Sequence, residues 1–346
     1  MTKTFSVCRL AELKMYFQIH FALTQRIRDV SDRRRPKMKS VLNALIGIVL
    51  TSSLAFHSEQ RHLRFQFASP TNAGSVVNSA GFDGGPAISP DGLTLYFTSE
   101  RAGGIGGGDL WATKRANLTE PFGAPENLGA TINSSANEFA PSISADGLSI
   151  YFDSDRVGGL GSFDIWVATR ATTTMAFNIP RNLGAAVNSN VSDGLPHISA
   201  DGLSLYFCSR RAGGFGDMDL WFSTRKATNQ PFAPAENLGP TINSAYYDGE
   251  PSISFDGLIL FFSSDRPGGF GNRDIWVATR PSQTAPFGKP SNLGAIVNSP
   301  AHDVRPNIST DEAVLFFMSD RPGGLGGIDL WQTINRARTI QRGRNE

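Results

Sequence analysis

Short apolar and β-branched runs, separated by Gly, Asp, Asn and Pro, recur along most of this chain. The clearest run follows the turn signal S-x-D-G and is apolar at nearly every position. This tract occurs five times at a spacing of 55 residues, with only its last copy departing from D-G; the copies begin at Ser89, Ser144, Ser199, Ser254 and Ser309. Self-similarity at a fixed period of this size predicts a repeat architecture.

Each repeat contains four short β-prone runs. In the second copy these are NEFAPSIS, LSIYFDS, DIWVATR and NLGAAVNS, and turn-forming or polar stretches separate them. Runs of this length bounded by turn residues predict antiparallel strands, and no helical periodicity between them suggests βαβ units. A repeating unit of four strands is typical of a β-propeller blade.

The fourth run determines the number of blades. It follows repeats one to four, but the fifth repeat ends without it. The segment NAGSVVNS at residues 72–79 is in register with the fourth run at residues 127–134 and can supply the missing strand. We therefore predict an all-β fold, a five-bladed propeller over residues 66–335. Each blade has four antiparallel strands, and the N-terminal strand closes the ring by joining the last blade.

The N-terminal region differs in composition from the repeats. Residues 1–37 are read as an upstream extension, and residues 38–55 as a signal peptide or membrane anchor. A short basic start, an apolar core and small residues before polar HSEQ form a secretory signal pattern. The anchor alternative places RRRPK at residues 33–37 on the cytoplasmic side, although the apolar run is shorter than the roughly 20 residues of a span. We expect export to the periplasm or the extracellular space, with membrane contact only if residues 41–56 stay as an anchor.

Charge and cysteine content exclude further classes. Without residues 1–55, acidic residues outnumber basic ones, which argues against nucleic-acid binding. The basic tail at residues 336–346 is read as a solvated end, and we expect a monomer. Only Cys8 and Cys208 are present, so no internal disulfide is expected after cleavage. Cys208 occupies a strand position that other copies fill with Thr98, Asp153, Ser263 and Met318, which favours a substituted strand residue over a nucleophile.

The repeat motif S-x-D-G-x-x-[LI]-[YF]-F-x-S-[DE]-R, followed by D-[IL]-W, resembles the WD-like repeats of the TolB-type β-propeller family. In the second copy, FDSDR at residues 152–156 and DIW at residues 164–166 carry the resemblance. It covers all five repeats but not the separate N-terminal α/β domain and six blades of TolB itself. The resemblance implies an exported binding or scaffold propeller.

Two features recur in every repeat and predict structural roles. The loop GGxGxxD is read as a hairpin whose glycines permit positive φ; the alternative, an isolated calcium site, requires six or more oxygen ligands. No other metal or cofactor is expected. An Arg and an Asp also recur in each copy, and we predict that they form an ion pair within each blade. The arginines are Arg101, Arg156, Arg211, Arg266 and Arg321, and the acids are Asp109, Asp164, Asp219, Asp274 and Asp329.

A second acidic register lies three residues before the Pro of each presumed innermost strand. It comprises Asp83, Glu138, Asp193, Asp248 and Asp303. These carboxylates either cap turns or form a ring at one mouth of the channel that receives a cation or polar ligand. Beside the same Pro, His197, Glu250 and Arg305 break the repeat pattern. They form either an asymmetric polar patch in the channel or, for Glu250 and Arg305, a pair between neighbouring blades.

Two functional classes follow. The first is a non-catalytic propeller that binds a protein, peptide or glycan, because no HExxH, GxSxG or paired Cys/His spacing is present. The second is a glycan hydrolase in which Glu250 and one of Asp83, Asp193 or Asp248 supply acid and base at the axis. The even spacing of the acids counts against the second class, since two catalytic carboxylates need different environments.

Overall fold

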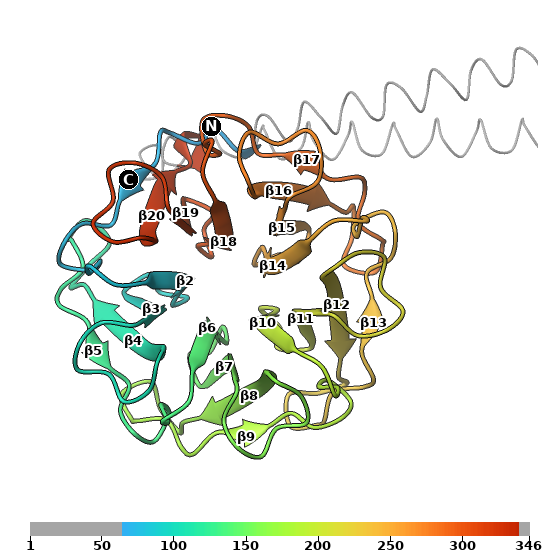
Figure 1. Cartoon of the computed structure of the whole chain (residues 1–346), viewed down its shortest axis with the longest axis horizontal. Helices are drawn as coiled ribbons and strands as arrows, with labels where there is room; N and C mark the ends of the chain where they lie inside the picture. The colour runs from blue at the N-terminus through green and yellow to red at the C-terminus, as the bar shows by residue number, and fades with distance from the viewer. Residues whose placement is uncertain (1–63, 339–346) are drawn as a thin grey trace, which may run out of the picture. The chain divides into compact units, whose positions relative to one another are not determined.

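The computed structural model describes residues 64–338, and these form five four-stranded antiparallel sheets around a central axis (Figure 1). The structure confirms the predicted five-bladed β-propeller. The predicted extension, the signal or anchor segment and residues 339–346 of the tail lie outside the described residues. Within residues 64–338, no helix has the length and apolar character needed to cross a membrane.

Every blade has three six-residue strands and a two-residue outer strand. The innermost strands are β2 (Asp83–Ile88), β6 (Glu138–Ile143), β10 (Asp193–Ile198), β14 (Asp248–Ile253) and β18 (Asp303–Ile308). The second strands are β3 (Thr94–Ser99), β7 (Ser149–Ser154), β11 (Ser204–Ser209), β15 (Ile259–Ser264) and β19 (Val314–Ser319). The third strands are β4 (Asp109–Lys114), β8 (Asp164–Thr169), β12 (Asp219–Thr224), β16 (Asp274–Thr279) and β20 (Asp329–Ile334). The outer strands are β5 (Glu126–Asn127), β9 (Arg181–Asn182), β13 (Glu236–Asn237), β17 (Ser291–Asn292) and, in the fifth blade, β1 (Thr71–Asn72).

The N-terminal segment closes the ring as the repeat register predicts. Strand β1 pairs antiparallel with β20, and Asn72 lies opposite Trp331, just as Asn127 lies opposite Trp111 in the first blade. Asn78 strengthens this closure, because its side-chain amide donates to the carbonyl of Leu330 (3.0 Å) and accepts from its N–H (2.9 Å). The last blade therefore contains both ends of the repeat region.

Glu312 links the two ends further. It replaces the glycine that the other four copies place in the S-x-D-G turn, and it adopts a left-handed φ of 59°. Its buried carboxylate accepts hydrogen bonds from Arg64 Nε (2.9 Å) and Arg338 Nη2 (2.5 Å). Arg338 was predicted to belong to a solvated tail, but it is bound here because the chain end returns beside the closing blade.

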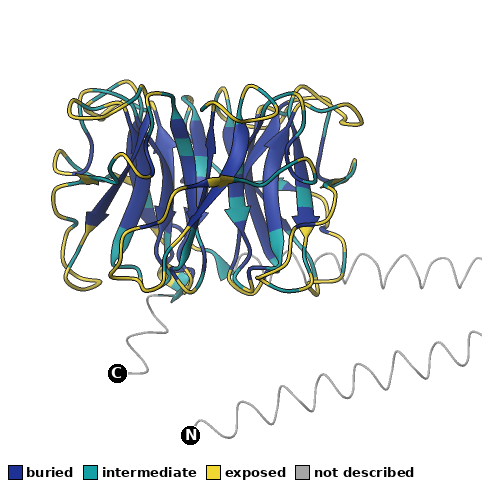
Figure 2. Cartoon of the chain, turned by 90° about the horizontal axis from the view of Figure 1, so that it is seen from below, coloured by how far each residue is buried: buried dark blue, intermediate teal, exposed yellow. Residues whose placement is uncertain are grey.

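The hydrophobic core lies between neighbouring blades rather than within a single sheet. In one such cluster, Tyr96 and Leu110 of the first blade pack with Phe152 and Trp166 of the second. The second strands are buried along nearly their whole length, as their continuous apolar pattern predicts. Figure 2 shows buried strands with exposed loops at both faces and at the rim.

Glycine in the GGxG loops lets each blade approach the next. The third glycine of every loop faces a backbone carbonyl of the following blade, at a position where an added Cβ would lie only 1.7–2.3 Å from the oxygen. These glycines are Gly106, Gly161, Gly216, Gly271 and Gly326. The first position of the loop also requires glycine, since Gly103 and its four equivalents have φ values of 93–100°, as the sequence predicts.

The ion pair within each blade uses a different acid from the one predicted. Arg101 binds Asp83 (2.6 Å) and Arg156 binds Glu138 (2.8 Å), and the other three blades repeat this pair. The predicted partner, Asp109, instead accepts hydrogen bonds from the backbone N–H groups of Ile105 and Gly106 and from the side chain of Asn127. The N–H groups of the Gly loop already bind this carboxylate, so the arginine pairs with the acid that is the first residue of the innermost strand.

Candidate functional site

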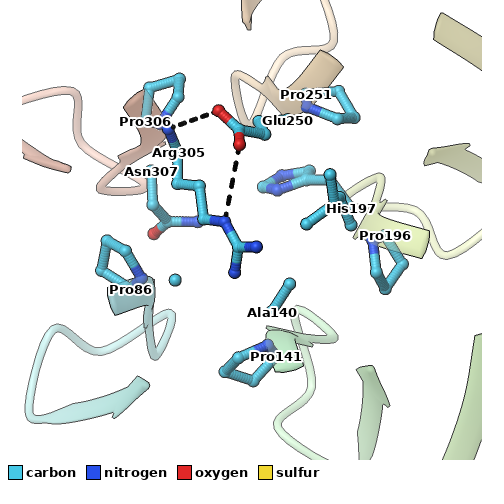
Figure 3. Close-up of a pocket in the computed structure, with 12 residues that line it drawn as sticks. Pro86, Ala140, Pro141, Pro196, His197, Glu250, Pro251, Arg305, Pro306 and Asn307 are labelled. Carbon is cyan, nitrogen blue, oxygen red and sulfur yellow. Dashed lines mark hydrogen bonds and ion pairs between the residues drawn. The ribbon is translucent and has the colours of Figure 1, made fainter. Parts of the chain in front are cut away.

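The propeller axis is lined by the residue that precedes each proline of the innermost strands (Figure 3). All five of these pre-proline residues have a left-handed φ between 50° and 61°, at a register shift that interrupts pairing with the second strand. A bulge of this kind turns the side chain away from the ladder. The pre-proline residues are Gly85, Ala140, Leu195, Glu250 and Arg305, so the channel is asymmetric.

The backbone N–H of the pre-proline residue donates a hydrogen bond to the preceding blade. In four cases it donates to a side chain on a second strand: Ala140 to Thr98, Leu195 to Asp153, Glu250 to Cys208 and Arg305 to Ser263, at 2.9–3.1 Å. Cys208 is thus one member of a set of structural acceptors. Burial raises the pKa of its thiol well above the ordinary value, which agrees with the reading that it is not a nucleophile.

Glu250 and Arg305 meet across neighbouring blades, and His197 lies beside them at the axis (Figure 3). Glu250 Oε2 accepts the backbone N–H of Arg305 at 3.2 Å, while Oε1 lies 3.7 Å from Arg305 Nε. Both alternatives predicted for these residues therefore hold: they form a polar patch in the channel, and two of them are paired.

Two further residues complete this patch: Tyr247, which the sequence places beside Glu250 as aromatic surface, and Arg273, which the sequence reasoning missed. Arg273 Nη1 lies 3.8 Å from Glu250 Oε1, and the hydroxyl of Tyr247 donates to the same oxygen at 3.4 Å. Arg273 also stacks on the ring of Tyr247, with 3.6 Å between the guanidinium carbon and the ring centroid. Arg273 stands where the other copies have Gly108, Phe163, Met218 and Ile328, and this break in the pattern is the signal that could have identified it.

The desolvated surroundings shift the pKa of several groups at the axis. Burial raises the pKa of Asp153 to about 7, although the nearby guanidinium of Arg305 opposes this shift. Burial lowers the pKa of His197 to about 4, which keeps its imidazole neutral. Burial and the charge of Glu250 raise the pKa of Tyr247 well above its ordinary value. The imidazole of His197 and the hydroxyl of Tyr247 are therefore uncharged at neutral pH.

The acidic register lies elsewhere than at the channel mouth. All five carboxylates are fully buried and bound to the arginine of their own blade. Each also accepts the hydroxyl of the serine four residues before it, as Asp83 does from Ser79 at 2.7 Å. None of them borders the channel cavities. Asp83, Glu138, Asp193, Asp248 and Asp303 are placed within the blades because the arginine folds back over them.

The channel itself is narrow. Its cavity beside the pre-proline residues has a volume of about 30 Å³, and a second cavity toward the S-x-D-G turns has about 50 Å³. His197 and Asn307 border both cavities, so the two are adjacent. A larger cavity of about 200 Å³ lies off the axis, between the S-x-D-G turn and second strand of the fifth blade and the S-x-D-G turn of the first. The axis has room for water or a small ion.

The face opposite the S-x-D-G turns carries a ring of exposed apolar side chains at the tips of the Gly loops. It consists of Ile105, Leu160, Phe215, Phe270 and Leu325, which are 44–52% exposed, and we call it the apolar ring. Sequence reasoning treated these loops only as turns and missed the ring. The available signal was that every GGxG loop places a large apolar residue at the same exposed position.

No protein-family model matches this sequence, and a comparison with curated proteins also gives no match. Among solved structures, the chain is similar to the catalytic domain of the GH62 α-L-arabinofuranosidase of Coprinopsis cinerea, with a TM-score of 0.50, 12% identity, and coverage of 79% of this chain and 97% of that one. It is also similar to an α-L-arabinofuranosidase from Lactobacillus brevis (TM-score 0.50, 10% identity, coverage of 76% and 94%). TolB from Acinetobacter baumannii is similar as well (TM-score 0.48, 16% identity), and this chain covers 56% of its length with 75% of its own. At these identities the similarity shows the propeller fold alone.

Proposed function

We propose that this chain is an exported, non-catalytic propeller of the cell envelope that binds a protein partner through its Gly-loop face. The observation that carries the proposal is the apolar ring. Large apolar side chains repeated on one face of a soluble domain are typical of an interaction surface. The ring presents one such side chain from each of the five blades on the same face.

The loops that present the ring are held in place before any partner binds. In each loop, the N–H of the apolar residue and the N–H of the following glycine both donate to the aspartate that begins the third strand, as in Phe270, Gly271 and Asp274. The same two bonds occur in the other four loops. A preorganised surface loses little conformational entropy on binding.

Charge on the same face indicates the chemistry of the partner. Four blades expose a carboxylate directly after the second strand, next to the Gly loop: Glu100, Asp155, Asp265 and Asp320. The fifth equivalent is Arg210 in the third blade. The surface therefore combines apolar side chains with mostly negative charge, which suits a partner surface that is apolar and basic.

The channel supports binding over hydrolysis. Pockets that enclose a small organic ligand usually have volumes of about 300–1,000 Å³, and the axial cavities of about 30 and 50 Å³ are much smaller. Hydrolysis of a glycoside needs two accessible carboxyl groups on either side of the bond. Of the four acids considered for that role, Asp83, Asp193 and Asp248 are buried in ion pairs, and Glu250 lies between two arginines.

Site-specific crosslinking tests the face. A photoreactive residue is placed at Phe215 or Phe270 of the full chain, and at Met175, which is equally exposed but lies in a loop at the other end of its blade. We expect both Gly-loop positions to crosslink to one defined envelope protein in cells, and Met175 not to. Equal crosslinking from both faces would contradict the proposal.

A glycoside panel tests the competing enzyme. The purified chain is incubated with aryl glycosides and polysaccharides, and release of the leaving group is measured beside Glu250→Gln. We expect no turnover from either protein. Turnover by the wild-type chain that Glu250→Gln removes would replace the binding function with hydrolysis. Sequencing the N-terminus of the protein from the host tests the export prediction, which places the new N-terminus just after residue 55.

A further inference from the structure

The guanidinium of Arg305 occupies the axis without a full set of hydrogen-bond partners. Its Nε and Nη1 atoms are shielded from solvent, and neither has an acceptor within residues 64–338. Glu250 Oε1 is the nearest carboxylate oxygen, but its distance of 3.7 Å from Nε is too long for a hydrogen bond. Buried donors in native proteins are nearly always paired, so this arginine lacks an acceptor that the channel should hold.

The charge of the site is also unbalanced. Arg305 and Arg273 both face Glu250, so two positive charges meet one carboxylate. Arg273 Nε is likewise buried without an acceptor among the described residues. Water could accept a hydrogen bond but would leave the extra positive charge uncompensated in a desolvated site. While the carboxyl of the nearby Asp153 is protonated, below its pKa of about 7, a single negative charge balances the site.

The cavity beside Arg305 has room for a small ion. Arg305 reaches across the axis toward the first and second blades, where the pre-proline residues are the smallest of the five (Figure 3). A Cβ added to Gly85 would lie 3.1 Å from Arg305 Nη1, which shows how closely the guanidinium approaches this wall. The adjoining cavity of about 30 Å³ is large enough for a water-sized particle, since about 10–15 Å³ on this measure holds one water.

We propose that the propeller channel binds one compact monovalent anion, such as chloride or formate, on the unpaired N–H groups of Arg305. The anion lies in the axial cavity beside the guanidinium. We place entry on the S-x-D-G side, where the second cavity adjoins the first at His197 and Asn307. The ion lies between Arg305 of the fifth blade and the first two blades, and so stabilises the closed ring. This inference does not depend on whether the Gly-loop face binds a partner.

Diffraction from bromide-soaked crystals of the full chain tests the site directly. Bromide replaces chloride and scatters anomalously, so we expect one anomalous peak in the channel within hydrogen-bond distance of Arg305 Nε or Nη1. Water alone at this place, or an empty cavity, overturns the proposal. Because this experiment uses the wild-type chain, it does not depend on any variant folding.

Thermal unfolding tests binding in solution. Chloride or formate is compared with gluconate, which is too large for the cavity, at equal ionic strength. We expect each small anion to raise the Tm of the wild-type chain by roughly 2 °C or more with saturation, and Arg305→Met to lose this rise. The matched control is Arg210→Met, which removes an exposed arginine that pairs with Asp217. An equal rise in Arg305→Met overturns the proposal, and the anion with the lower half-saturation concentration is the preferred ligand.

The pH dependence of the anion effect provides an independent test. The carboxyl of Asp153 is near Arg305, the N–H of Leu195, the thiol of Cys208 and Asp155. Since its pKa is about 7, Asp153 gains a negative charge between pH 6 and pH 8 and then competes with the anion for Arg305. We expect the chloride-dependent rise in Tm to be larger at pH 6 than at pH 8, and equal at both values in Asp153→Thr. A larger rise at pH 8 would contradict an anion beside Arg305.

Discussion

Asp153 is an ionisable residue at a position where the neighbouring blades use neutral acceptors, so its replacement should reveal the cost of burying it. The change Asp153→Thr introduces the residue that the first blade has at this position. The hydroxyl of Thr98 accepts the N–H of Ala140 at 3.1 Å, and Asp153 accepts the N–H of Leu195 at the same distance. Threonine can therefore keep the hydrogen bond and remove only the titrating group.

The magnitude follows from the shift in pKa. The pKa of Asp153 rises from 3.8 to about 7 on folding. Each tenfold change in a protonation equilibrium is worth about 1.4 kcal/mol, so the shift corresponds to about 4 kcal/mol. Below pH 3.8 both states carry the proton and nothing is lost. Between pH 3.8 and about 7 the unfolded state is ionised while the folded state is not, so stability falls as the pH rises through this window.

Urea unfolding at a series of pH values measures the effect. Other groups titrate equally in both proteins, so the difference between variant and wild type isolates residue 153. We expect the free energy of unfolding of Asp153→Thr, relative to wild type, to increase by about 4 kcal/mol between pH 4 and pH 8. The control is Asp217→Thr, which removes an acid whose side chain is 62% exposed. If the stabilities of Asp153→Thr and wild type change in parallel with pH, the reasoning about burial is wrong.

Three further substitutions test other parts of the structure. Wild type should lose about 1–2 kcal/mol of stability through His197 as the pH falls from 6.5 to 5, because only the unfolded state takes up a proton there. His197→Ser should not show this loss, and urea unfolding at both pH values measures the difference. Glu312→Gly should relieve the strain of a left-handed φ of 59° but remove the carboxylate that binds Arg64 and Arg338. We expect a net loss of about 1–2 kcal/mol in the free energy of unfolding and a lower Tm; an unchanged Tm would show that this clamp between the two arginines does not stabilise the ring. Gly326→Ala should destabilise the ring by about 3 kcal/mol or more, because its Cβ would lie 2.3 Å from a carbonyl oxygen. A Cβ on the adjacent Gly327 would meet nothing within 4 Å, so Gly327→Ala should change stability by less than about 0.5 kcal/mol. Similar Tm values for the two variants would refute the close approach at Gly326.

The blade count was predictable because it depends on register alone. No insertion disturbs the 55-residue period, so the missing fourth run of the last repeat and the unmatched segment at residues 72–79 could be joined from the sequence. Strand alternation and turn residues are local properties, and the repeat supplies five independent readings of each. The pairing of β1 with β20 follows from the same register.

Contacts that depend on side-chain direction were not predictable in the same way. Arg101 has one acid eight residues after it and another eighteen before it, and sequence distance favours the first. The structure selects the second, since the Gly loop already surrounds Asp109 with its own N–H groups. Glu312 was visible as a break in the S-x-D-G motif, but its partners lie at the two ends of the described chain. The outliers at the axis could be identified, whereas their distances and the narrowness of the channel required the fold.

The equivalence of the five blades means that packing does not require the two ends of residues 64–338 to meet in this particular blade. Trp331 faces Asn72 in the same register in which Trp111 faces Asn127, although one pair is joined through the whole chain and the other through a short loop. A circular permutant that joins residues 64 and 338 and opens the loop between β8 and β9 would make the same ladders with different neighbours in sequence. In such a permutant Glu312 would no longer bind two chain ends, and the clamp it forms with Arg64 and Arg338 would lie within a continuous chain.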